Sequence, residues 1–206
     1  PGRVAPCSGP ITCTMPWRLS RNGKYAAAPK AWMLASSVTT CWREVGSVIP
    51  SSRFLTRRTL ECGGIAQARV IVELGPGTGV LTRHALERMR PDAKLVAIEI
   101  SADFVEVLRK ELPDPRLYIH HGSATEVEAA LAKVGESKAD LVMSGIPFST
   151  LEHGVGFATL QAAKRVLGPE GRFVAYQFRS KVKDLGEPVF GARPETHSGF
   201  WNVPPM

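Results

Sequence analysis

A glycine-rich stretch at residues 72–79 has the composition of a ligand-binding turn. It reads Val-Glu-Leu-Gly-Pro-Gly-Thr-Gly, with glycine at every second position from 75 to 79. Glycine lets the backbone turn tightly and approach a ligand without a Cβ clash, and a helix beginning near Val80 points the positive end of its dipole at the turn. The stretch therefore predicts a turn that binds a nucleotide-like or carboxylate-bearing ligand.

Two acidic residues narrow the class of that ligand. Dinucleotide-binding turns carry G-x-G-x-x-G, but here position 80 is Val and the third glycine is Gly79. Glu73, directly before the glycines, repels a pyrophosphate but can hold an amino-acid ammonium. Glu99 lies twenty residues after Gly79 and can accept hydrogen bonds from both ribose hydroxyls. An ammonium and a ribose together describe S-adenosylmethionine rather than NAD.

The elements that must position these residues alternate between strand and helix. Apolar runs predict buried strands over residues 69–74, 94–100, 116–121, 139–144 and 172–178. Amphipathic segments predict helices over residues 53–62, 80–90, 102–111, 127–134 and 152–167. We expect Gly63-Gly64 to end the first of these helices and Ser101 to cap the third. This alternation predicts an α/β fold in which helices cover both faces of a parallel sheet.

Charge divides the chain into two parts. Residues 1–37 contain five prolines and no clean hydrophobic period, so we expect an irregular basic N-terminal segment there and one folded domain over residues 38–206. The net charge is +7, and residues 1–60 hold nine Lys and Arg against one acidic residue. This asymmetry indicates an anionic partner, either a membrane surface or nucleic acid.

Composition excludes several other classes of protein. Apolar residues make up 44% of the chain and charged residues 22%, which is ordinary for a globular domain. The sequence has no apolar run of membrane-spanning length. Its four cysteines form no C-x-x-C pair and have no His at ligand spacing, so we expect free thiols in a reducing cytoplasm and no metal site.

The sequence resembles the class I S-adenosylmethionine-dependent methyltransferases over about residues 46–205. The resemblance rests on the motif E-x-G-x-G-x-G and on the distal acid Glu99. The resemblance implies a Rossmann-like three-layer sandwich with a mostly parallel sheet, and we expect its C-terminal edge strand to be truncated. It places Ser123 where these enzymes often have an Asp near the exocyclic amine of adenine. It implies S-adenosylmethionine contacts from Glu73, Gly75, Pro76, Gly77, Thr78, Gly79, Glu99, Ile100, Gly122, Ser123, Ala124 and Ser144.

The loop after the fourth strand, residues 144–150, faces the methyl group in this class of enzyme. Adenine and cytosine amino methyltransferases carry Asn or Asp at its start, which grips the flat amine while an aromatic residue stacks on the base. Here Ser144 takes that position, and a single rotating hydroxyl binds a planar amine less well than the side chain of Asn or Asp. The candidate catalytic residues are Ser144, Gly145, Pro147, Phe148 and Tyr176, with Glu152 and His153 as further proton acceptors.

Several segments look like the bacterial phospholipid N-methyltransferases, which act on phosphatidylethanolamine. They are VGSVIPSSRFL (residues 45–55), VELGPGTGVLTR (72–83), SGIPFST (144–150), GRFVAYQF (171–178) and WNVPP (201–205). This resemblance implies a lipid-amine acceptor and a cytoplasmic enzyme held peripherally at an anionic inner membrane face, where aromatic and basic residues of 17–32 can lie among headgroups. Similarity to ribosomal RNA adenine dimethyltransferases leaves nucleic acid as the less favoured partner, and a non-catalytic cofactor-binding module stays open as well.

Overall fold

The computed structural model describes residues 11–14, 53–149, 151, 153–177, 181–191 and 195–196. Its α-helices are α2 (Arg53–Gly63), α3 (Val80–Leu86), α4 (Ala102–Glu111), α5 (Val127–Ala132), α6 (His153–Val166) and α7 (Lys181–Phe190), and a 3-10 turn η2 (Ala124–Glu126) precedes α5. Its strands are β1 (Ile11–Thr14), β2 (Val70–Leu74), β3 (Lys94–Glu99), β4 (Leu117–His121), β5 (Ala139–Ser144), β6 (Leu167–Gln177) and β7 (Glu195–Thr196). The remaining predictions for residues 1–37 lie outside the described residues.

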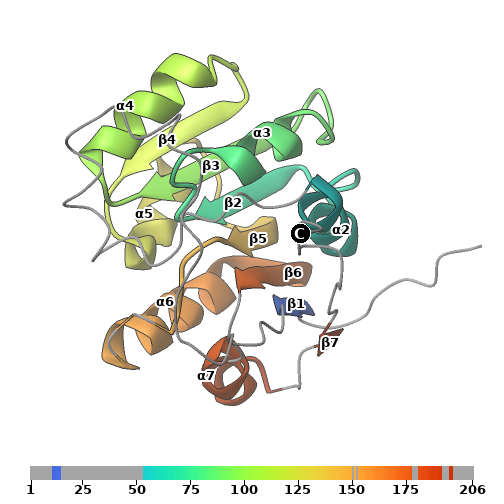
Figure 1. Cartoon of the computed structure of the whole chain (residues 1–206), viewed down its shortest axis with the longest axis vertical. Coiled ribbons are helices and arrows are strands. Elements are labelled where there is room, and N and C mark those ends of the chain that lie inside the picture. Colours follow the sequence, from blue (N-terminus) through green and yellow to red (C-terminus); the bar gives the residue numbers. More distant parts are fainter. Residues whose placement is uncertain are drawn as a thin grey trace, which may run out of the picture.

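The described strands form one sheet in the order β4-β3-β2-β5-β6-β1-β7, and every pair in it is parallel (Figure 1). The five predicted strands are present as β2 to β6, so the α/β prediction is confirmed. Strand β1 corrects one expectation, because four residues of the segment predicted to be irregular pair with β6. A sheet edge carries unpaired N–H and C=O groups, and β1 satisfies those of β6.

Helices cover both faces of this sheet and give three layers (Figure 1). Successive side chains of a strand point to opposite faces. On β2, Ile71 joins the core beneath α2, α3 and α4, while Val72 and Leu74 join the core beneath α5, α6 and α7. Burial on both faces is what a parallel sheet requires and explains the near-continuous apolar runs of the sequence.

The predicted end of α2 is confirmed in detail. Gly64 has φ +74°, and its N–H donates to the carbonyl of Glu61 at 3.0 Å. The N–H of Ile65 donates to the carbonyl of Leu60 at 3.1 Å, and these two side chains belong to the same core. The pair of bonds satisfies the last carbonyls of the helix, and the left-handed residue that it needs is a glycine.

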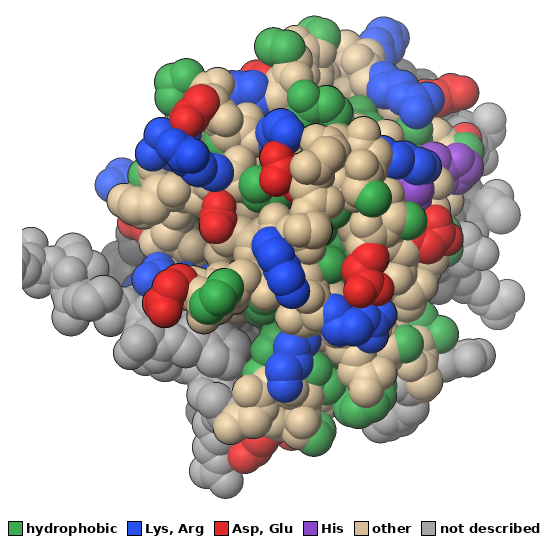
Figure 2. Space-filling model, turned by 180° about the vertical axis from the view of Figure 1, so that it is seen from behind, with side chains coloured by type: hydrophobic (Ala, Val, Ile, Leu, Met, Phe, Trp, Pro, Cys, Tyr) green, Lys and Arg blue, Asp and Glu red, His purple; other side chains and the backbone are tan. Residues whose placement is uncertain are grey.

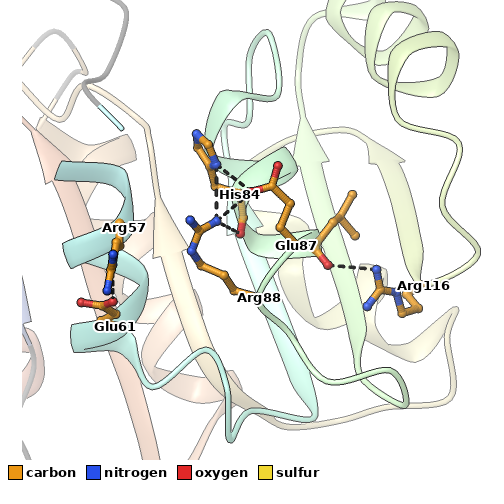
Figure 3. Close-up of polar contacts among 7 residues, drawn as sticks. Arg57, Glu61, His84, Glu87, Arg88 and Arg116 are labelled. Carbon is orange, nitrogen blue, oxygen red and sulfur yellow. Dashed lines mark hydrogen bonds and ion pairs between the residues drawn. The ribbon is translucent and has the colours of Figure 1, made fainter. Parts of the chain in front are cut away.

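Two predicted boundaries differ from the structure by more than two residues. Helix α3 ends at Leu86 rather than at residue 90, and Arg116 donates to the carbonyl of Leu86 at 2.9 Å (Figure 3). Strand β6 begins at Leu167, although the glycines and proline of residues 168–171 predict a turn. Those residues form an irregularity in the pairing, because β5 residues Ala139 and Leu141 pair with Leu167 and Arg172 of β6.

The face of the molecule in Figure 2 carries interspersed basic and acidic side chains. This agrees with residues 61–206, which hold 17 Lys and Arg against 18 acidic residues. Among the helices of the described residues, none combines the length and hydropathy needed to cross a bilayer.

We predict that the Arg116 side chain stabilises the sheet edge measurably. Its guanidinium binds both carboxylate oxygens of Asp114, at 2.9 and 2.7 Å, in addition to the Leu86 carbonyl. Because Arg116→Met leaves these partly buried acceptors without their donors, it should lower the free energy of unfolding by about 2 kcal/mol. The matched control Arg57→Met breaks an exposed pair with Glu61 and should cost no more than about 0.5 kcal/mol in urea denaturation. Equal losses would contradict this role.

Candidate cofactor and acceptor site

The carboxyl ends of four neighbouring strands meet at one edge of the sheet. Leu74 at the end of β2 pairs with Ile98 of β3 on one side and with Ser144 of β5 on the other. On the far side of β3, Glu99 pairs with His121 of β4. Sequence order reverses between β2 and β5, and in open parallel sheets ligands bind in the crevice at such a reversal.

The predicted glycine turn follows β2, and each of its glycines has a left-handed backbone. Gly75, Gly77 and Gly79 have φ values of +68°, +56° and +78°. A Cβ on Gly75 would lie 2.7 Å from Ile146, and a Cβ on Gly79 would lie 2.7 Å from Leu108, so these two glycines permit close packing. A Cβ on Gly77 would meet nothing within 4 Å. Gly77 is therefore the glycine that faces open space at the edge of the sheet.

Glu99 joins this turn to the end of β3. Its carboxylate accepts from the Gly77 N–H at 2.9 Å through Oε2 and from the Ser101 N–H at 3.0 Å through Oε1. Ser101 occupies the predicted N-cap position of α4, but its side chain makes no capping hydrogen bond. Glu99 is only 5% exposed, and each carboxylate oxygen keeps a further lone pair. It can therefore accept from ribose hydroxyls while it holds the turn.

Ile100, directly after Glu99, offers an apolar surface at the same edge. Its side chain is 71% exposed, and its apolar surface suits the face of a flat base. The imidazole of His121 donates through Nε2 to the Ile100 carbonyl at 3.1 Å. The backbone beside this apolar surface is thus tied to β4.

Glu73 lies beneath α3 with only 1% of its surface exposed. Burial raises the pKa of its carboxyl to about 8, the nearby Thr82 hydroxyl partly opposes this rise, and the charge of Glu99 adds to it. Glu73 Oε2 and Thr82 Oγ1 are nevertheless both outside hydrogen-bonding geometry to any other described group. A buried polar atom without a partner is costly, and a cationic group at this position would supply one.

The loop after β4 holds the predicted residues Gly122, Ser123 and Ala124. Ser123 Oγ accepts from the Thr125 N–H at 3.3 Å, and the Glu126 carboxylate accepts from the Ser123 N–H at 3.3 Å. Ser123 is thus the N-cap of η2 in a capping box. The S-x-x-E spacing of Ser123 and Glu126 is the sequence pattern of a capping box. Glu126 is nevertheless not among the site residues predicted from the sequence.

The loop after β5 (residues 144–150), which is the predicted acceptor loop, buries two of the predicted catalytic residues. Ser144 is fully buried, and its hydroxyl accepts from the Ile146 N–H at 3.3 Å. Phe148 is also fully buried, in the core beneath α6, where Gly156 leaves room for its ring. In this conformation the apolar ring of Phe148 packs into the core, and the catalytic role of Phe148 stays a prediction. Gly145 is exposed and Pro147 is partly buried.

Three predicted proton acceptors lie outside the described side chains. Tyr176 is on β6 and His153 begins α6, but the structure describes only their backbone, and it does not describe Glu152. Within the described residues, no group of three or more His, Cys, Asp and Glu side chains is arranged to hold a metal ion.

Comparisons with known proteins agree with this geometry. A family model described as "Methyltransferase domain" matches residues 71–171. The ornithine lipid N-methyltransferase of Singulisphaera acidiphila is 32% identical over 130 residues, which are 63% of this chain and 68% of that protein. Ribosomal RNA small subunit methyltransferase A of Caulobacter vibrioides is 34% identical over 97 residues, but they span only 35% of that protein and 46% of this chain.

Solved structures show the same fold at low sequence identity. TrmN from Thermus thermophilus has a TM-score of 0.54 at 14% identity, over 64% of this chain and 40% of that one. A methyltransferase from Geobacter sulfurreducens has a TM-score of 0.50 at 20% identity, over 72% of this chain and 71% of that one.

We predict that Gly77→Val abolishes the binding of S-adenosylmethionine. The new side chain strains a residue with φ +56° and fills the open space beside Glu99. Affinity in calorimetry should fall at least tenfold, about 1.4 kcal/mol. Gly135→Val is a matched control, because Gly135 has φ +76° and equally open surroundings but lies in the loop between α5 and β5. Unchanged affinity of the Gly77 variant, or equal losses in both, would exclude the turn from the site.

We predict that Glu73 makes stability depend on pH. Its folded pKa of about 8 lies above the ordinary value of 4.5, so between these values the folded chain binds more protons than the unfolded chain. The free energy of unfolding should therefore fall as pH rises through this range, by up to about 1.4 kcal/mol per pH unit. In urea denaturation from pH 5 to 9, Glu73→Gln should flatten this dependence, whereas the exposed control Glu106→Gln should preserve it. Parallel curves for both variants and the parent would contradict the assignment.

Proposed function

Because this chain belongs to the S-adenosylmethionine-dependent methyltransferases, we propose that it methylates the amine of a membrane lipid such as phosphatidylethanolamine. S-adenosylmethionine supplies a methyl group on a positively charged sulfur, which is already a good leaving group. The chain must therefore bind the cofactor, present a neutral amine to it and keep the two aligned, and such alignment supplies most of the acceleration.

The described residues fit the parts of the cofactor. The turn around Gly77 leaves space at the end of β2, and Glu99 is placed to accept from ribose hydroxyls. The unpartnered carboxyl of Glu73 suits the ammonium of the methionine portion, whose positive charge would favour the ionised carboxylate. The exposed side chain of Ile100 suits the adenine face.

The loop after β5 provides the observation that favours a lipid amine over a nucleic-acid base as the methyl acceptor. An adenine amine is planar, and its recognition uses a planar side chain and a stacked ring. Here the Ser144 hydroxyl is fully buried and accepts from the Ile146 N–H, and the Phe148 ring is fully buried. An aliphatic amine needs neither group, because a backbone carbonyl of Ser144 or Gly145 suffices to orient its nitrogen. Its ammonium form must first lose a proton, and apolar surroundings favour that loss.

The surface beside this loop also favours a lipid. Val155 and Phe157 lie in the first turns of α6 and are 45% and 37% exposed. Their apolar surface suits the acyl region of a lipid better than a phosphate backbone. The positive excess of residues 1–60 adds attraction to an anionic bilayer, at about 1 kcal/mol for each basic residue near the surface. We therefore infer a peripheral enzyme of the inner membrane face.

The alternative acceptor is an adenine of ribosomal RNA. It is supported by the similarity to the Caulobacter vibrioides enzyme, and the basic N-terminal residues would serve RNA phosphates as well as lipid headgroups. That similarity spans only 35% of the relative's length.

We predict that the purified chain, offered vesicles containing phosphatidylethanolamine together with ribosomal RNA and labelled S-adenosylmethionine, transfers label to the lipid. Mass spectrometry of both fractions should find methylated ethanolamine headgroups and unmodified RNA. Gly77→Val should abolish the transfer and Gly135→Val should retain it. Label on RNA adenines with inert vesicles would establish the alternative. Cofactor binding without transfer to either acceptor would instead indicate a non-catalytic module.

A further inference from the structure

The last two residues of β4 are histidines, and the first of them contacts two charged groups of later elements. His120 Nε2 lies 3.0 Å from Glu126 Oε2, and His120 Nδ1 lies 3.2 Å from Lys133 Nζ. The imidazole is 9% exposed, whereas the Glu126 side chain is 50% exposed. A nearly buried ring thus restrains one oxygen of a half-exposed carboxylate.

The two neighbours fix where the ring carries its proton. A lysine ammonium has donors and no acceptor, so His120 Nδ1 must accept from Lys133. The proton of the neutral imidazole is then on Nε2, which donates to Glu126. This hydrogen bond is also the first cause that holds the pKa of Glu126 below its ordinary value, followed by the bond from the Ser123 N–H.

Glu126, held by His120, also binds the loop after β4. Its other oxygen accepts from the Ser123 N–H, so one carboxylate bridges the strand and the capping box of η2. Gly122 lies between them, and a Cβ there would be 2.5 Å from Glu126 Oε2 and 2.8 Å from His120 Nε2. The Gly122 N–H donates to the Glu99 carbonyl at 2.9 Å. The pair is therefore linked through Gly122 to the backbone of Glu99, the residue whose carboxylate accepts from the glycine turn.

We propose that His120 is a positioning residue, which through Glu126 holds residues 122–124 in the conformation that binds the adenine end of the cofactor. Without the imidazole, the capping box relies on bonds of 3.3 Å and on a half-exposed carboxylate. The inference concerns only the cofactor, so it stands or fails independently of the acceptor that is methylated.

Substitutions of His120 test this directly, with S-adenosylhomocysteine as the probe because it binds without turnover. In calorimetry, His120→Leu should weaken binding about tenfold. His120→Gln places an amide N–H near the position of Nε2 and should recover most of the affinity. Glu128→Gln removes an acid from the next helix that pairs with Arg165, and it should bind like the parent chain. Unchanged affinity of His120→Leu, or equal losses in Leu and Gln variants, would overturn the proposal.

If thermal unfolding shows that His120→Leu is not folded, Glu126→Gln serves as a second variant. Its amide oxygen can still accept from the Ser123 N–H, so the capping box is kept. Its NH₂ would then face the Nε2–H of His120, so that two donors oppose each other. Moving the imidazole proton to Nδ1 would only place that proton against the Lys133 ammonium. We expect an intermediate, severalfold loss of affinity with little change in melting temperature. Parent-like affinity in this variant would contradict the proposed chain of contacts.

Discussion

The hydrogen bond from the Gly77 N–H to Glu99 is the contact on which the rest of the site depends. It joins the ends of two neighbouring strands through a carboxylate that is only 5% exposed. The bond requires a left-handed backbone at Gly77 and an acid at the last residue of β3. Because a buried carboxylate without partners is strongly disfavoured, the two features stabilise each other and fix the turn before any ligand binds.

Packing around this bond leaves the glycine turn little freedom. On one side a Cβ on Gly75 would lie only 2.7 Å from Ile146 of the loop after β5, and the Gly145 N–H donates to the Leu74 carbonyl. On the other side a Cβ on Gly79 would lie only 2.7 Å from Leu108 of α4. The glycine turn and the loop after β5 are thus one packed unit. Such a unit suits a reaction whose rate depends on holding two reacting atoms in line.

Local sequence signals predicted the sheet because each central strand is buried on both faces and therefore reads as an apolar run. They also predicted the glycine turn and Glu99, whose chemistry follows from residue type and spacing. They missed α7, since Gly186 and Pro188 disfavour a helix, and its apolar residues are buried in a core that it shares with α6. The burial of Phe148 was likewise unpredictable, because it depends on the space that Gly156 leaves on a distant helix.

The contacts of His120 belong to the same class of missed features. Each residue is ordinary alone, and only the fold brings the ring to Glu126 and Lys133. The central claim is that the nucleoside lies against Gly77 and Glu99, and a crystal structure with S-adenosylhomocysteine tests it most directly. We expect the ribose hydroxyls within hydrogen-bonding distance of Glu99 and the homocysteine ammonium near Glu73. A ligand bound away from this edge, with the Glu99 carboxylate in contact only with backbone N–H groups, would contradict the account.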